Sequence, residues 1–185
     1  MENKSSFLRQ KGNYKGLIVY QKAECIYDIT YHFVHRFLER GDRTIDQMIQ
    51  AARSGKQNIA EGSAAATTST ETELKLINVA KASLQELLVD YEDFLRVRGL
   101  ELWSKDDKRY MQARKFCSKH NDSEHYRNLL PERTAETIAN IAITLIHQAD
   151  YLIERLLQRL QEEFLQNGGI KEQMYNARVK AKHNQ

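Results

Sequence analysis

The sequence predicts an all-α protein: an antiparallel up-and-down four-helix bundle with long helices and a basic insert before the last helix. Its composition supports this, because 29% of the 185 residues are charged, 41% are apolar and only one is proline, as in helices with polar outer faces. Apolar residues also recur every three or four positions over four long stretches, which is the pattern of one helix face. We therefore expect more than about 65% helix and no sheet, well above the average for globular proteins.

The first helix is predicted over residues 15–39 and the second over residues 43–61. The core-facing side of the first helix carries Val19, Ala23, Ile26, Thr30, Phe33 and Phe37. Gly41 stops this helix and Asp42 caps the next one. In the second helix, Ala51, Ala52 and Gly55 are small enough for another helix to approach closely. Such packing would offset the roughly 1 kcal/mol that a glycine costs inside a helix.

The third helix is predicted from Thr70 to Gly99, and Thr70 and Glu73 have the spacing of a capping box at its start. The last helix is predicted over residues 132–166, with Pro131 as its first residue, where the missing N–H costs nothing. At 1.5 Å per residue, this last helix would span roughly 50 Å. It is therefore at least as long as the other three.

Two further segments surround the last helix. Between residues 100 and 130 the periodicity weakens, and Ser104 to Asp107 resembles the N-cap of a short basic helix that a loop follows at residues 120–125. Asn167-Gly168-Gly169 ends the last helix, and the basic tail behind it forms a weak helix or stays disordered. The predicted organisation is a flexible N-terminus (1–13), a four-helix bundle (14–167) and a basic C-terminal tail (168–185).

Charge and hydropathy exclude several classes of protein. Lysine and arginine are concentrated in residues 1–22 and 168–185, while the segment between these ends is net acidic. Both ends could contact an anionic polymer, or they are solvated tails. The sequence contains no run of 18 apolar residues, so no transmembrane helix is expected. The N-terminus lacks the apolar core of a signal peptide. Cys25 and Cys117 lack metal-ligand spacing, so we expect free thiols, a cytoplasmic protein and no cofactor.

A family resemblance begins in the first helix and is most specific at the end of the second. The matching runs are Leu17 to Ala23, Gln47, Ala51-Ala52, Ser54, Asn58 to Gly62, Glu71 to Leu74, Ala80 to Leu84 and Glu86-Leu87. Over roughly residues 14–100 the chain resembles the bacterial four-helix-bundle proteins first noted in intervening sequences of 23S ribosomal RNA. The accessory protein of diversity-generating retroelements belongs to that group. The segment after Gly99 and the tail after Gly168 resemble a variant with a C-terminal suffix.

The resemblance implies a barrel-shaped homopentamer with a central channel. In the retroelement member, a basic surface engages reverse transcriptase and nucleic acid. For most of the family no activity is established, and membership in a fold family does not fix function.

Basic side chains off the apolar seams are the candidate nucleic-acid contacts. They are Arg43, Arg53 and Lys56 on the outer face of the second helix, and Lys108, Arg109, Arg114 and Lys115 in the basic insert. Tyr110 and Phe116 lie among the insert's cations, and cations interleaved with aromatic rings suit single-stranded nucleic acid. The alternative is an amphipathic helix that packs these two rings inward.

Asn58, Glu61 and Gly62 form a candidate structural motif. We predict that they clamp the end of the second helix to its connector, with a binding role as the alternative. Because a carboxylate at a helix C-terminus opposes the helix dipole by some 0.3–1 kcal/mol, Glu61 should have a cationic or helix N-terminal partner.

Enzymatic and metal-binding arrangements have weaker support in the sequence. His32, His35 and Asp28 share a helical face, but a second helix would have to supply further metal ligands, and the Glu-x-x-His motif of bundle metal sites is absent. Arg114 and His120 have the loose Arg–His spacing of helical ribonucleases, in which the histidine acts as base and the arginine stabilises charge.

Three functions remain. The first is a non-enzymatic oligomer that binds RNA, DNA or a nucleic-acid-processing protein through basic surfaces. The second is a scaffold oligomer that has only protein partners. The third is a helical ribonuclease or toxin-like enzyme. The first accounts best for the placement of the basic residues, so we expect no enzymatic activity and no membrane partner.

Overall fold

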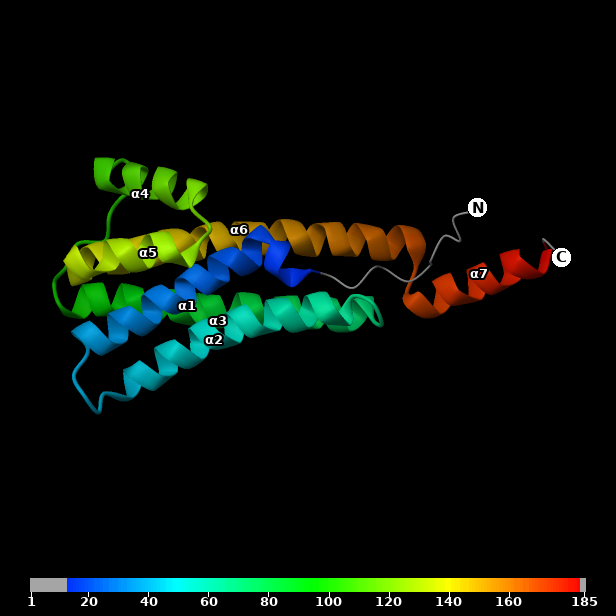
Figure 1. Cartoon of the computed structure of the whole chain (residues 1–185), viewed down its shortest axis with the longest axis horizontal. Helices are drawn as coiled ribbons and strands as arrows, with labels where there is room; N and C mark the ends of the chain where they lie inside the picture. Colours follow the sequence, from blue (N-terminus) through cyan, green and yellow to red (C-terminus); the bar gives the residue numbers. More distant parts are fainter. Residues whose placement is uncertain (1–12, 184–185) are drawn as a thin grey trace.

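The structure is a computed structural model that describes residues 13–183, and over this range it contains helices and no strand (Figure 1). It is 83% helix, so the all-α prediction is confirmed. The long helices are α1 (Ile18–Phe37), α2 (Arg43–Ala65), α3 (Thr70–Val97) and α6 (Ala135–Asn167). The shorter ones are α4 (Lys108–Lys119), α5 (Ser123–Leu129) and α7 (Ile170–His183), with 3₁₀ turns at Tyr14–Gly16 and Leu130–Glu132.

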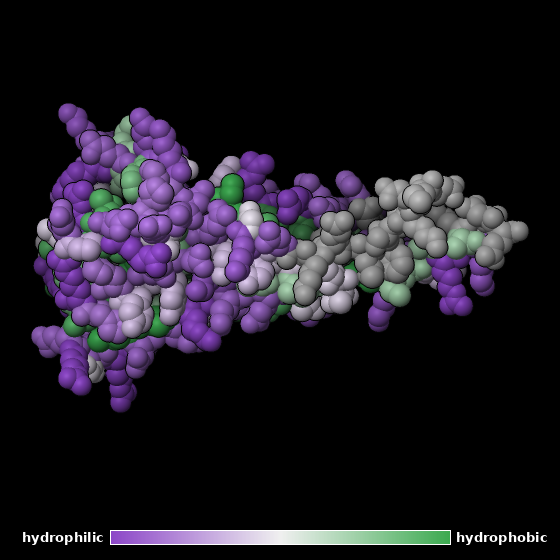
Figure 2. Space-filling view, in the orientation of Figure 1, coloured by the Kyte–Doolittle hydropathy of each residue, from purple (hydrophilic) through white to green (hydrophobic). Residues whose placement is uncertain are grey.

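The four long helices pack in a closed ring. α1 contacts α2 and α6, and α3 contacts the same two helices from the other side, so α2 and α6 occupy opposite corners. α4 packs on α6 and α5 packs on α1, while α7 continues past the end of α6 and away from the other helices (Figure 1). The surface over these helices is largely hydrophilic with scattered apolar patches (Figure 2).

The core between the long helices is largely apolar and includes a hydrogen-bonded pair of polar side chains, Thr30 and Tyr91. The ring of Phe33 lies 5.0 Å from that of Tyr91 and 4.7 Å from that of Phe94. The hydroxyl of Tyr91 is fully buried and donates to Thr30 Oγ1 at 3.0 Å. Because a buried hydroxyl without a partner costs free energy, this bond explains why Thr30 is tolerated on the apolar face of α1.

Small residues bring α2 and α3 together, as the sequence predicts. A Cβ atom added to Gly55 would lie 2.7 Å from Leu84 Cδ2, and one added to Gly62 would lie 3.1 Å from Ile77 Cδ1. Beside Gly55, Ser54 Oγ lies 2.8 Å from the hydroxyl of Ser83 on α3. This close approach requires glycine at position 55.

The second helix is longer than predicted, and this changes the position of its sequence motif. α2 continues to Ala65, so Asn58, Glu61 and Gly62 lie within the helix and do not clamp its end. Ser63-Ala64-Ala65 sustains the helix because alanine has the highest helix propensity. Asn58 Nδ2 donates to the carbonyl of Ser54 at 2.9 Å. Glu61 is exposed and has no ion-pair partner among residues 13–183.

α3 begins at Thr70, as predicted, but its cap, the start of α6 and the loop at 120–125 differ from the prediction. Ser69, not Thr70, caps α3, since Ser69 Oγ accepts from Thr72 N at 3.1 Å. Pro131 lies in the 3₁₀ turn before α6, and Thr134 Oγ1 caps α6 by accepting from Thr137 N at 3.2 Å. The predicted loop at 120–125 is shortened because Asp122 caps α5.

The predictions for the end of α6 and for the C-terminal tail can be compared with the structure, whereas the prediction for the N-terminus cannot. α6 ends at Asn167, where Gly168 takes a φ of 68°, so the predicted stop is confirmed. Of the two possibilities for the tail, the structure has a helix, α7. The predicted flexible N-terminus lies outside the described residues except for Asn13.

Candidate anion-binding groove

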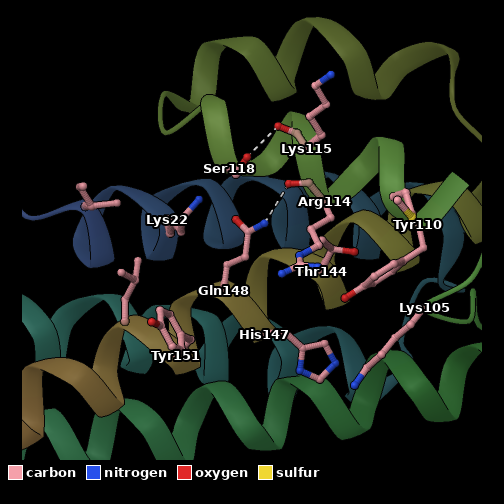
Figure 3. Close-up of a pocket in the computed structure, with 13 residues that line it drawn as sticks. Lys22, Lys105, Tyr110, Arg114, Lys115, Ser118, Thr144, His147, Gln148 and Tyr151 are labelled. Carbon is pink, nitrogen blue, oxygen red and sulfur yellow. Dashed lines mark hydrogen bonds between the residues drawn. The ribbon is translucent and has the colours of Figure 1, made fainter. Parts of the chain in front are cut away.

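A groove with a volume of about 920 Å³ separates α4 from α6 and has α1 at its base (Figure 3). α4 is held in place by contacts at its start and near its middle. At its start, Asp107 caps the helix and Arg109 binds Asp107 and Glu101, each at 2.6 Å. Farther along, Gln148 Nε2 of α6 donates to the carbonyl of Arg114 at 3.1 Å. The groove between the helices is therefore a consequence of how α4 is anchored.

The segment that leads into α4 is fixed by one residue of α6. Asn140 is buried, and its side chain accepts from the backbone N–H of Trp103 at 2.8 Å and donates to the carbonyl of Glu101 at 2.9 Å. Residues 100–107 are in no helix, so their backbone groups need other hydrogen-bond partners, and Asn140 supplies two of them. Asn140 thus positions the loop from which Lys105 reaches the groove.

The groove lining is cationic. Lys22, Lys105, Arg114 and Lys115 line it, and no aspartate or glutamate among residues 13–183 does. Arg114 reaches from α4 toward α6, whereas Lys115 extends outward from the rim (Figure 3). Several positive charges close together make the local electrostatic potential more positive, which attracts an anion. The lining therefore favours an anionic ligand.

Lys22 differs from the other cations because it is buried, with only 4% of its surface exposed. Its Nζ donates to the carbonyl of Cys117 at 2.7 Å. Cys117 is in the last turn of α4, where carbonyls lack partners within the helix, so the ammonium also lies at the negative end of the helix dipole. Burial lowers the pKa of Lys22.

Aromatic and apolar side chains complete the lining. Tyr110 projects from α4, and Tyr151 projects from α6 with 56% of its surface exposed. Ile18 and Met111 are also exposed at the groove. The rings offer flat surfaces on which a nucleobase can stack, while the cations are suited to phosphate.

The predicted nucleic-acid contacts fall on two separate surfaces. Arg114 and Lys115 line the groove, whereas Lys108 and Arg109 do not. Hydrogen bonds from Arg109 to Asp107 and Glu101 raise the pKa of Arg109, and these carboxylates offset its charge. The second set (Arg43, Arg53 and Lys56) is on α2, at the opposite corner of the ring from α6.

Within the α2 set, only Lys56 contacts an aromatic ring. Its Nζ lies 4.3 Å from the ring centre of Tyr27 on α1. A concave surface between α2 and α3 is lined by Asp46 and Glu86 and by none of these three cations, so its potential is less favourable to an anion than that of the α4–α6 groove.

The two rings of the basic insert have different surroundings. Phe116 packs against Tyr126 of α5 at 5.5 Å between ring centres, so this ring follows the inward-packing alternative. Tyr110 faces the groove. The ring of His120 lies 4.4 Å from those of both Phe116 and His125, and His120 does not line the groove that Arg114 faces.

The other candidate polar groups lie away from the groove. His32, His35 and Asp28 line a separate hollow on α1, and residues 13–183 bring together no group of three or more side chains suited to hold a metal ion. Cys25 and Cys117 are free and buried, as predicted, and burial raises their pKa to about 12 and about 11.

Sequence reasoning missed Lys22, which it counted only as part of the basic N-terminal segment. The available signal was its position: Lys22 lies three residues after Val19 and four before Ile26, on the apolar face of α1. A lysine in such a position is either buried or reaches to the surface with its head group. Gln148 and Tyr151 were missed because nothing in the sequence indicates that α4 packs on this part of α6.

Comparison with protein-family models, curated proteins and solved structures gave no match to this chain. Within the described part of the chain, no helix has the length and apolarity required to cross a membrane.

Proposed function

We propose that this protein is a non-enzymatic, oligomeric helical bundle that binds single-stranded nucleic acid in the groove between α4 and α6. The observation that carries the proposal is the groove lining, which has four cationic side chains and no carboxylate. Phosphates would contact Lys105, Arg114 and Lys115, and bases would stack on Tyr110 and Tyr151. Binding of this kind has little sequence preference because phosphates and the faces of all bases are common to every strand.

The proposed architecture is the antiparallel up-and-down arrangement, in which the connection from α3 to α6 contains α4 and α5. Contacts of α1 with α2 and α6, and of α3 with the same pair, support it. For assembly, we propose the homopentamer that the family resemblance implies. Val79, Val89 and Val97 leave exposed apolar surface along α3, which suits contact with another copy. We propose a cytoplasmic location because Cys25 and Cys117 are free thiols, as is usual in a reducing compartment.

The proposal is tested by two matched charge reversals and a fluorescently labelled single strand. Arg114→Glu with Lys115→Glu changes the groove, and Arg53→Glu with Lys56→Glu makes the same change in net charge on α2. At low salt we expect the double substitution of Arg114 and Lys115 to weaken binding by about tenfold or more, because each lost phosphate contact lowers the affinity strongly. The α2 pair should have a smaller effect. Equal losses would contradict binding in the groove, and a larger loss in the α2 pair would place the site there.

A scaffold with protein partners is the second candidate function, and one observation favours it. Ile18, Met111 and Tyr151 expose apolar surface around the groove, and methionine and tyrosine are common in protein interfaces. Such a partner would bind with weak salt dependence compared with nucleic acid. Salt titration of the affinity therefore separates the two functions.

A further inference from the structure

Lys22 has more hydrogen-bonding capacity and more charge than its described surroundings use. An ammonium group has three N–H donors, and the bond to the Cys117 carbonyl occupies one of them. Among residues 13–183, no carboxylate forms an ion pair with Lys22. The groups that interact electrostatically with it are the thiols of Cys25 and Cys117.

These thiols cannot neutralise the ammonium near pH 7. Burial raises the pKa of Cys25 to about 12 and that of Cys117 to about 11, so both remain uncharged. The negative end of α4 offers only about half a charge. A buried charge without an ionic partner is costly, and an anion that enters through the groove would complete the site.

The burial of Lys22 limits which anion can reach it. A phosphate within a strand has a sugar on both sides, so it needs an open trench to contact an amine. Only 4% of the Lys22 surface is exposed, so a group at the end of a chain can approach it more readily than a phosphodiester can. Ser118 lines the groove near the same end as Lys22, but its hydroxyl donates to the carbonyl of Lys115 at 2.9 Å, so Lys22 is the donor available to an anion there (Figure 3).

We infer that Lys22 binds the terminal phosphate of a nucleic-acid strand whose bases lie along the groove. This inference rests on the proposed function and adds recognition of the end of the strand. A terminal phosphate carries nearly two negative charges at pH 7, so it matches a buried ammonium better than a phosphodiester does. Lys105, Arg114 and Tyr151 would then contact the following nucleotides, since all three line the same groove.

The experiment compares strands of about ten nucleotides, a length within the range that single-strand sites cover. Each carries a 5′ phosphate, a 3′ phosphate or hydroxyls at both ends, and affinity is measured by fluorescence anisotropy. The variants are Lys22→Met and, as a matched control, Lys75→Met, which removes an exposed lysine of α3 that pairs with Glu71. Lys22→Gln is the second variant, because its amide can still donate toward Cys117 if the methionine variant is poorly folded.

We expect the wild type to bind one phosphate-ended strand about tenfold more tightly than the hydroxyl-ended strand, as for one charge-assisted hydrogen bond. In both Lys22 variants the ratio should fall to about twofold, the share due to added charge alone. Lys75→Met should retain the wild-type ratio. A strand lengthened by one nucleotide, which adds charge without a terminal phosphate, should not reproduce the tenfold gain.

Three results would overturn the inference. If wild-type protein binds all ends equally and binding stays salt-dependent, end recognition is wrong while nucleic-acid binding stands. A preference for the phosphate end that persists in both Lys22 variants would assign it to other residues. If a nucleoside monophosphate competes as strongly as the phosphate-ended strand, the ligand is a small phosphate and not a strand. Failure of every strand to bind at low salt would contradict the proposed function itself.

Discussion

Gly55 shows how a single residue sets the distance between two helices. A Cβ atom at this position would lie 2.7 Å from Cδ2 and 2.9 Å from Cγ of Leu84, so the Leu84 side chain would have to shift within the core in which it is fully buried. Gly62 differs because a Cβ atom there would lie 3.1 Å from Ile77 Cδ1, so a shift of only a few tenths of an ångström would accommodate it. Both glycines are in α2 and would gain the same helix propensity from alanine.

We predict that Gly55→Ala lowers the free energy of unfolding by about 1 kcal/mol, because overpacking outweighs the gain in helix propensity. Gly62→Ala is the matched control and should be neutral or slightly stabilising. Urea unfolding followed by circular dichroism measures both. Stabilisation by Gly55→Ala would show that α2 and α3 are farther apart than the structure has them.

The charge of Lys22 gives a prediction about pH. Burial lowers its pKa from the usual 10.5, so between the lowered pKa and 10.5 the unfolded chain binds more protons than the folded one. Wild-type stability therefore rises with pH through this window, and the full cost of the buried ammonium is present below it.

Lys22→Met removes this cost, so its stability relative to the wild type should be highest near pH 7 and should decline as the pH approaches 10.5. Urea unfolding at several pH values gives the comparison. Lys75→Met, at an exposed position of α3, is the control. A difference between Lys22→Met and the wild type that does not vary with pH would contradict a buried ammonium at this position.

At the scale of elements, the existence of the long helices could be predicted, but several of their ends could not. The apolar periodicity of α1 and α6 is independent of neighbours, because it reflects one buried face. An end depends on which of several polar residues caps the helix. Ser69 and Thr70 are both suitable caps by composition, and only the hydrogen bond from Thr72 N distinguishes Ser69.

The start of α6 gives a test of this correction. Thr134 Oγ1 accepts from Thr137 N, so Thr134→Ala should lower stability by about 1 kcal/mol, as is usual for loss of an N-cap. Pro131→Ala should have a smaller effect, because Pro131 precedes α6 and is in the exposed 3₁₀ turn. Thermal unfolding measures both, and the reverse order would favour a helix that begins at Pro131.

The candidate groove could be predicted only in part because it depends on how elements pack. The basic character of α4 is visible in the sequence, and Arg114 and Lys115 follow from it. Lys22 does not, since it meets the Cys117 carbonyl across 95 residues of chain. The local pairing of Arg109 with Asp107 two residues before it could have been found, because an N-cap aspartate is close to the first turn of its helix.

At the scale of the whole molecule, self-association should depend on the exposed apolar side of α3. We predict that wild-type protein has a mass in light scattering of five times the 21.6 kDa protomer and that Val89→Glu dissociates it, because a buried unpaired carboxylate is costly in an interface. Arg53→Glu, a charge reversal at an exposed position of α2, is the control. A wild-type mass of 21.6 kDa at micromolar concentration would contradict the oligomer.

Measuring the number of phosphate contacts that the groove makes is the most direct test of nucleic-acid binding by this protein. It is obtained from the slope of the logarithm of affinity against the logarithm of salt concentration for a single strand. Arg114→Gln and Lys115→Gln should each reduce the magnitude of that slope by somewhat less than one, and Arg53→Gln on α2 should leave it unchanged. A wild-type slope near zero, or a slope that neither groove substitution alters, would contradict binding of nucleic acid in the groove between α4 and α6.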